Sequence, residues 1–374
     1  MSATFPAQTY SKYPDRYPPG APVRAVGAEG AHVLCQDANG KTRWYLDCTN
    51  GMGSVILGHC DPGVDEAVRC QLALGVAFPL GTIIEGRVAD RLLGLVGWPG
   101  AEAVRFAKNG ADVTGAAVKL ARAVTGRQVI LKNAYHGHHP WSKTEAPMNG
   151  GVLLEERWNS IPVAHNDVRM LEEKFIARPV AALVLEAVPS GAPEVPTPEY
   201  LQVARELCDR YGALLVLDEM VTGFRVALGG AAEAYDIRPD LACYGKALGN
   251  GHAVSALAGP WKIMERLDRD VFFSTTHGGE AIGLAAALAT LRALAEYAVP
   301  GRLGDCGSDL SRALAGTDVS MAGYPARPFF SFAHAEQREP FLAALLEAGL
   351  LCQGYINPSL ATTEIWRDVI DAVA

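Results

Sequence analysis

Short apolar runs alternate with longer amphipathic stretches through the middle of the chain. The apolar runs lie at Val104–Phe106, Val129–Leu131, Val180–Leu185 and Ala213–Leu217, and helical patterns such as Val113–Ala123 and Pro198–Tyr211 separate them. Strands that are apolar throughout are typical of a parallel sheet that is buried on both faces. The pattern therefore predicts an α/β fold in which helices cover a mostly parallel sheet.

The two ends of the chain follow other patterns. The first twenty residues, rich in Pro, Tyr and Ser, predict an extended arm without a regular element, and residues 22–47 predict short strands. The Ala/Leu-rich stretch Ala281–Ala295 predicts a long helix that leaves the large unit, and Phe329–Ala333 predicts a strand of a smaller α+β unit. We therefore expect an N-terminal arm with part of a small domain (1–56), a large domain (57–284) and a C-terminal small domain (285–374).

The composition is that of an ordinary globular protein. The chain has 374 residues, of which 49% are hydrophobic and 20% charged, and this length suits two domains. A formal net charge of −8 argues against general binding to nucleic acid or to an anionic membrane, although a local anion pocket is compatible with it. No apolar stretch is long enough to span a bilayer, and the start lacks a secretory signal. We expect a cytoplasmic protein.

The cysteine and histidine residues do not form a recognisable metal motif. The eight cysteines are scattered, without a Cys-x-x-Cys pair, and are expected to be reduced thiols. His136, His138 and His139 lie close together but lack a further carboxylate or cysteine at ligand spacing. We therefore predict no metal site.

Three places at strand ends carry candidate chemistry, because ligands of a parallel sheet bind beyond the carboxyl ends of its strands. Asp218 and Glu219 end an apolar run, where a carboxylate serves equally well as a helix cap. Asn109–Gly110 leads into a helix whose amides suit a phosphate, although such a pair is more often an ordinary turn. Lys246 lies among small residues, and burial there would favour a neutral amine that condenses with an aldehyde, although a lone lysine in such a loop is more often a surface residue.

The order and spacing of these places give the chain a resemblance to a known family. Seven blocks match in family order: Gly51–Pro62, Arg105–Asp112 with Lys119–Arg127, Tyr135–Gly137, Leu185–Glu186, Asp218–Arg225, Pro239–Lys246 and Ser274–Gly279. On these blocks the chain resembles the class III aminotransferases, which are fold type I pyridoxal-phosphate enzymes. Within them it looks closest to the glutamate-1-semialdehyde aminomutase-like branch.

The resemblance implies roles around the cofactor, pyridoxal 5'-phosphate. Lys246 would hold it as a Schiff base, the internal aldimine, and later move a proton, while Asp218 would keep the pyridine nitrogen protonated. The other implied cofactor contacts are Tyr135 on one ring face, Met220 or Val221 on the other, and Asn109, Gly110 and Ala111 at the phosphate. Ala111 replaces a hydroxyl residue that many relatives have there.

The resemblance also implies a homodimer whose active sites lie at the subunit interface, with Thr276 reaching the phosphate of the partner's site. Glu186 corresponds to an acidic residue near the cofactor. Arg225 is a candidate clamp for a substrate carboxylate, and a structural ion pair explains it equally well. We assign both residues to substrate binding as expectations. The segment after Lys246 is shorter than in most relatives.

These roles imply that an amino group moves between a small amine or amino acid donor and a keto or aldehyde acceptor. The same apparatus serves an aminomutase or an epimerase, and both remain alternatives. A pyridoxal-phosphate fold without turnover is disfavoured by the intact Lys246, Asp218 and Tyr135. A nicotinamide-dependent oxidoreductase would need a Gly-x-Gly-x-x-Gly motif between its first strand and helix, which the sequence lacks.

Overall fold

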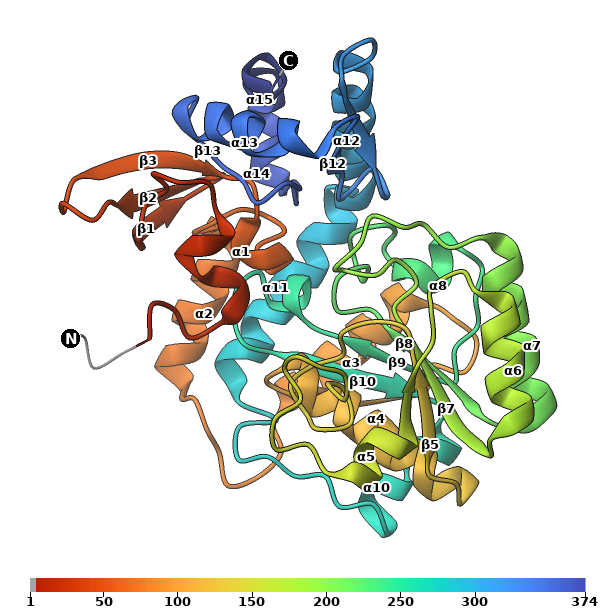
Figure 1. Cartoon of the computed structure of the whole chain (residues 1–374). Coiled ribbons are helices and arrows are strands. Elements are labelled where there is room, and N and C mark those ends of the chain that lie inside the picture. The colour runs from red at the N-terminus through yellow and green to blue at the C-terminus, as the bar shows by residue number, and fades with distance from the viewer. Residues whose placement is uncertain (1–4, 374) are drawn as a thin grey trace.

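The computed structural model describes residues 5–373 and shows a large unit beside a smaller one (Figure 1). The large unit is built on a seven-stranded sheet with the order β4-β10-β9-β8-β7-β5-β6. β10 is antiparallel to both of its neighbours, and the other six strands share one direction. The strands are β4 (Ala103–Ala107), β5 (Val129–Lys132), β6 (Ser160–Pro162), β7 (Val180–Leu185), β8 (Leu214–Asp218), β9 (Leu241–Tyr244) and β10 (Ser255–Gly259). The predicted α/β fold with a mostly parallel sheet is confirmed.

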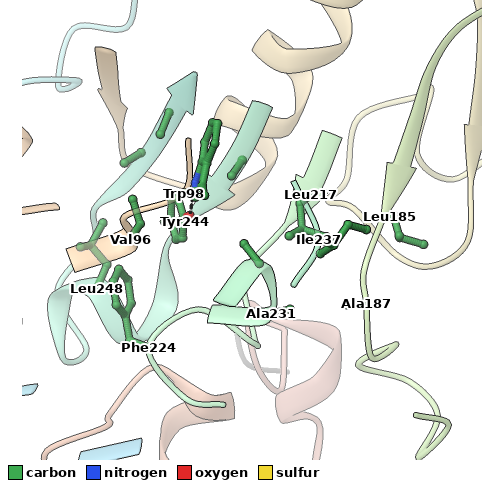
Figure 2. Close-up of a cluster of buried hydrophobic side chains, with 14 of the residues drawn as sticks. Val96, Trp98, Leu185, Ala187, Leu217, Phe224, Ala231, Ile237, Tyr244 and Leu248 are labelled. Carbon is green, nitrogen blue, oxygen red and sulfur yellow. Dashed lines mark hydrogen bonds between the residues drawn. The ribbon is translucent and has the colours of Figure 1, made fainter. Parts of the chain in front are cut away.

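Alternate residues of the central strands enter two separate cores. In β8, Leu215 and Leu217 belong to one buried cluster and Leu214 and Val216 to the other. Because successive side chains of a strand point to opposite faces, both faces of the sheet are covered. Figure 2 shows part of the first cluster, in which the Trp98 indole N–H donates a 3.1 Å hydrogen bond to the Tyr244 hydroxyl.

Helices lie on both faces of this sheet. They are α2 (Pro62–Leu74), α3 (Ile83–Val96), α4 (Gly110–Thr125), α5 (Leu154–Asn159), α6 (Val168–Ala177), α7 (Pro198–Tyr211), α8 (Gly230–Ala234), α9 (Trp261–Met264), α10 (Arg266–Arg269) and α11 (Ala281–Glu296). The helix predicted for residues 198–211 is α7, because Thr197 caps its first turn, Pro198 begins it and Gly212 ends it at φ 62°. The antiparallel strand β10 and the short edge strand β6 were not predicted.

The smaller unit combines both ends of the chain. Its four-stranded sheet has the order β1-β2-β3-β13, and β11 pairs with β12 in a second sheet. Its elements are β1 (Arg24–Glu29), β2 (His32–Gln36), β3 (Thr42–Asp47), α1 (Asn50–Gly53), α12 (Val299–Ala313), β11 (Val319–Ala322), β12 (Phe329–Phe332), α13 (Arg338–Glu347), β13 (Leu350–Leu351), α14 (Leu360–Glu364) and α15 (Trp366–Val373). In Figure 1, α11 runs from the large unit toward this smaller unit.

The N-terminal arm is more regular than predicted. It contains two short 3-10 helices, Tyr10–Lys12 and Pro14–Arg16, whereas we expected no regular element. Pro14 supplies the fixed φ of a first helical position, which explains the second turn. Residues 1–4 of the predicted arm lie outside the described residues.

The length and apolar character of a helix decide whether it could cross a membrane. Within residues 5–373, no single helix has the length and apolar character needed to cross a bilayer. α11 and α12 meet that criterion only when they are counted together, and they are bent by 64° relative to each other.

Candidate active site

Lys246 lines a cavity of 1120 Å³ between the large sheet and the smaller unit. It follows β9 and begins a short 3-10 helix, Lys246–Gly249, with φ of 43°. A left-handed conformation costs a residue with a side chain of the order of 1 kcal/mol, so the surrounding packing must hold it in place. Burial lowers the pKa of the Lys246 amine, although Glu186 and Asp218 act in the opposite direction. The site therefore favours the neutral amine more than water does.

Asp218 ends β8 and is 2% exposed. One carboxylate oxygen lies 2.7 Å from Nδ1 of His136, and the other accepts a 3.0 Å hydrogen bond from the amide of Met220. The His136 ring stacks on Trp141, and its Nε2 has no hydrogen-bond partner within residues 5–373. The sequence indicated His136 only as a member of a histidine cluster, so its bond to Asp218 was missed. No metal-binding group of three His, Cys, Asp or Glu residues occurs in this described part of the chain.

Glu186 follows β7, the strand beside β8, and is also buried. One of its oxygens accepts a 2.8 Å hydrogen bond from the amide of Ser190. Burial, reinforced by the charge of Asp218, raises the pKa of Glu186 to about 7. Glu186 therefore holds a proton over much of the acidic range, near an aspartate and a lysine.

This raised pKa predicts a pH-dependent stability. In the unfolded chain Glu186 ionises near its ordinary pKa of 4.5, so the folded state binds more protons between about pH 4.5 and 7. Stability linked to Glu186 is present below that window and is lost as the pH rises through it, by the order of 3 kcal/mol. Glu186→Gln should therefore raise Tm relative to the wild type at pH 8 and have little effect at pH 4.5. Glu206→Gln, at an exposed position, is the control. A difference in Tm between Glu186→Gln and the wild type that does not change with pH would contradict the expectation.

The N-terminus of α4 is a narrow, glycine-lined cradle. The Asp112 carboxylate accepts a 2.8 Å hydrogen bond from the amide of Asn109, and the first amides of a helix have no partner inside it. A Cβ on Gly110 would lie 2.7 Å from Sδ of Met220. On the other side, a Cβ on Gly137, whose φ is 109°, would lie 2.7 Å from Cβ of Ala111. At Gly137 the positive φ and the contact with Ala111 require glycine, whereas at Gly110 a larger residue would need the Met220 side chain to move. The amides of a 16-residue helix begin between these two positions.

The residues predicted to contact the cofactor ring lie at different depths, some at the cavity wall and one behind it. Tyr135 is 62% exposed and lines the cavity with Val221. Burial of its remaining surface and the charge of Asp218 raise the pKa of Tyr135. Met220 does not line the cavity and packs instead against Gly110 and Gly245.

Three other candidates lie away from the cavity lining. Arg225 is fully buried, and its Nη1 donates to the carbonyls of Pro358 (2.9 Å) and Ala326 (3.3 Å). Burial lowers its pKa to about 10, and no carboxylate pairs with it within residues 5–373. Glu219 accepts 2.9 Å hydrogen bonds from two amides at the start of α8. Thr276 is exposed in the loop before α11.

The cavity also contains residues that the sequence did not indicate. The arm contributes Thr9, Tyr10, Ser11, Lys12 and Arg16, and the side-chain amide of Gln353 donates a 2.9 Å hydrogen bond to the Ser11 carbonyl. Met52, Arg327 and Tyr355 complete the wall toward the smaller unit. They come from chain segments about 300 residues apart, so no local pattern could group them.

Comparisons with known proteins agree with this geometry. A family model described as aminotransferase class-III matches residues 17–366. The chain is 37% identical over 311 residues to a glutamate-1-semialdehyde 2,1-aminomutase of Syntrophobacter fumaroxidans, covering 76% of this chain and 71% of that protein. Its fold is similar to the FumI protein of Sphingopyxis sp. MTA144, solved in a PLP internal aldimine form, with a TM-score of 0.86, 29% identity and coverage of 100% and 91%. An omega-transaminase from Sphaerobacter thermophilus gives a TM-score of 0.84 at 26% identity, covering 98% and 92%.

Proposed function

The chain belongs to the class III aminotransferases, and from that premise we propose that it transfers an amino group from a small amine or amino acid to a keto or aldehyde acceptor, with Lys246 as its acid and base. Members of this family use pyridoxal phosphate. The observation that supports the proposal best is the buried Lys246 amine beside the buried carboxylates of Asp218 and Glu186.

The residues present fit pyridoxal phosphate. The first amides of α4, which Gly137 approaches closely, suit a phosphate that Asn109, Gly110 and Ala111 would hold. Lys246 would hold the cofactor through its amine. Bound there, the cofactor supplies a ring that accepts electrons from the substrate carbon.

The other protein groups would orient that ring. Asp218, fixed by His136 and by the Met220 amide, would keep a proton on the ring nitrogen. Tyr135 and Val221, both at the cavity wall, would cover the ring faces, with Met220 in the layer behind. Glu186, buried near Asp218 and also absent from the cavity lining, would be an acidic residue close to the cofactor. Arg225 does not line the cavity, so we propose a role for it in the fold and not at the substrate.

Proton transfer would then be the work of Lys246. Its amine is held by the short 3-10 helix Lys246–Gly249 at one wall of the cavity, and burial favours the neutral form that can accept a proton from the substrate. Returning that proton to a different atom completes the exchange. The arm and Tyr355 line the cavity, so they would contact a substrate held there.

We also propose a cytoplasmic homodimer. Large apolar side chains are exposed along residues 72–83 and at Phe272, including Leu80 (80%) and Ile83 (85%). The loop that carries Thr276 lies against the start of α3, because a Cβ on Gly279 would lie 2.9 Å from the Glu85 carboxylate. An exposed apolar surface next to this loop suits a second copy of the chain, whose site Thr276 would complete.

The dimer proposal predicts that Ile83→Glu yields a monomer that binds the cofactor at least about tenfold more weakly. Ile83 is the first residue of α3, where a negative charge favours the helix, so the variant should still fold. Sedimentation measures the mass, and fluorescence titration measures cofactor affinity. Ile176→Glu, at an equally apolar exposed position of α6, is the matched control. A dimeric Ile83→Glu variant would contradict the proposal.

The competing reactions of the family are separated by the fate of the amino group. When an amino donor is added to the holoenzyme, a transaminase loses its visible band, releases a carbonyl product and regains the band with a keto acid. An aminomutase instead returns an isomer of the donor in which the amino group has moved. An epimerase returns the donor with the configuration at one carbon inverted. Product analysis of a single turnover therefore tests the proposal directly.

A further inference from the structure

Two buried cysteines lie opposite each other where two strands of the smaller unit end. β13 runs parallel to β3, and its last residue, Leu351, lies beside Asp47, the last residue of β3 (Figure 1). The amide of Cys48 donates a 3.3 Å hydrogen bond to the Leu351 carbonyl, so the pairing continues past both strands. The next pair along this ladder is Cys48 and Cys352. Segments from the two ends of the chain thus meet at these two thiols.

Both side chains point to the same side of the sheet. Cys48 and Cys352 belong to one buried cluster with Leu46 and Leu350, which lie two residues before them, whereas Leu351 belongs to another cluster. This alternation is expected, because successive side chains of a strand point to opposite faces. Neighbouring strands are about 4.8 Å apart, which is within the range that the Cα atoms of a disulfide span. A bond between the two sulfurs therefore needs little movement of the strands.

The surroundings of the two thiols give them different reactivity. Sγ of Cys352 accepts a 3.3 Å hydrogen bond from the amide of Gly354. The neighbouring Cys48 thiol and this amide lower the pKa of Cys352, although burial opposes them. The Cys352 thiol and burial raise the pKa of Cys48 well above its usual value. Because the thiolate is the form that attacks an oxidant, Cys352 is the nucleophile of the pair and Cys48 is the thiol that keeps its proton.

The turn that follows Cys352 forms part of the wall of the active-site cavity. Gln353 and Tyr355 both line that cavity, and the Cys352 thiol donates a 3.4 Å hydrogen bond to the Tyr355 carbonyl. The thiol itself is buried, so an oxidant reaches it only when this turn opens locally. A peroxide, which is little larger than water, suits this route better than a bulky disulfide does.

We propose that Cys48 and Cys352 are a site of reversible oxidation, at which a peroxide forms a disulfide that joins the two ends of the chain and stabilises the fold. The Cys352 thiolate attacks one peroxide oxygen, the O–O bond breaks, and a sulfenic acid and hydroxide result. The Cys48 thiol then attacks that sulfur, so that an S–S bond forms, the S–O bond breaks and water leaves. In total, two electrons and two protons pass from the thiols to the peroxide, which becomes two waters.

This disulfide would constrain the unfolded chain strongly. It closes a loop of about 300 residues, and a cross-link removes more entropy from the unfolded chain as its loop becomes longer. It also joins two segments that already meet at the cavity wall, where the Tyr355 hydroxyl lies 3.5 Å from Sδ of Met52. Oxidation should therefore raise Tm. Formation of the bond requires neither substrate nor turnover, so the site goes beyond the proposed amino transfer and is tested without it.

The test uses holoenzyme that carries Cys60→Ser and Cys70→Ser, because these two exposed thiols could cross-link separate molecules. The protein is reduced with a phosphine, freed of it and treated with hydrogen peroxide. Proteolysis with mass spectrometry detects a peptide pair joined through Cys48 and Cys352, and thermal unfolding gives Tm before oxidation, after it and after a second reduction. Cys48→Ala and Cys352→Ala each remove one thiol. Cys306→Ala, at another buried cysteine of the same cluster, is the matched control.

We expect one main cross-linked peptide pair and a Tm about 5 °C above that of the reduced protein, both reversed by the phosphine. Cys306→Ala should show the same rise from its own starting Tm, and neither Cys48→Ala nor Cys352→Ala should show it. Dimedone, which traps sulfenic acids, should label Cys352 in Cys48→Ala and leave Cys48 unlabelled in Cys352→Ala.

The opposite results are equally distinct. Absence of the cross-linked peptide overturns the oxidation site, and this measurement does not depend on how well the alanine variants fold. A cross-link that leaves Tm unchanged or lowers it, or an equal rise in Cys48→Ala, overturns the stabilising role. Labelling of Cys48 in place of Cys352 overturns the assignment of the nucleophile.

Discussion

Lys246→Ala is expected to lower kcat for amino transfer by at least about 10⁴, the largest effect of any single substitution in this chain. The change removes both the amine that would hold the cofactor and the base that would move the substrate proton. Lys132, another lysine of the cavity wall, is already paired with Glu145 and is a poor substitute. Rates are measured with the donor that the wild type uses best, and cofactor retention is followed by dialysis and visible absorption.

Two observations keep this prediction specific. Circular dichroism and Tm should show that the variant folds, since alanine replaces a side chain at the cavity wall and not in either core. Small added amines should restore part of the rate, because they can enter the space that the lysine left. A variant that keeps a wild-type visible band after dialysis, or loses less than tenfold in rate, would refute the role of Lys246.

Asp218→Asn is expected to have the second largest effect, a loss of about 10² to 10³ in kcat. An amide cannot keep a proton on the ring nitrogen, so the ring would accept electrons less well. The hydrogen bonds to His136 and to the Met220 amide would also be altered, because asparagine offers one acceptor where the carboxylate offers two. Single-turnover rates and the absorption maximum of the bound cofactor measure both consequences.

Glu219→Gln is the matched control for that change. The two carboxylates are adjacent in sequence, both are buried, and both lose a charge in these variants. Glu219, however, accepts bonds from the amides of Ala231 and Ala232 and does not line the cavity, so its loss should leave the rate within about threefold of the wild type. Equal rate losses in the two variants would show that Asp218 acts through the fold alone.

The fold was predictable where local chemistry and tertiary packing agree. β8 has an unbroken apolar run, and α7 carries its cap, its first-turn proline and its terminal glycine in the sequence itself. β10 was missed because its sequence, Ser-Ala-Leu-Ala-Gly, consists mostly of small residues that do not favour a strand. The second 3-10 turn of the arm was missed because its proline also suits an extended chain.

The residues of the candidate site could also be predicted only in part. Resemblance to the family indicated Lys246, Asp218 and the start of α4, because these residues lie in short blocks with fixed spacing. The contacts of His136 and Arg327 were hidden, since their partners lie 82 residues and 30 or more residues away along the chain. Burial fixes the orientation of such polar side chains through their hydrogen bonds. Which residues are buried depends on the whole fold.

The two ends of the chain present different risks to anyone who attaches a purification tag. The arm from Thr9 to Arg16 lines the cavity and is tied to Gln353 through Ser11, so an extension at the N-terminus begins only a few residues from the substrate path. Val373 is buried in α15, so a segment attached just beyond it starts at the core of the smaller unit. A removable N-terminal tag, cut before any kinetic comparison, is therefore the safer choice.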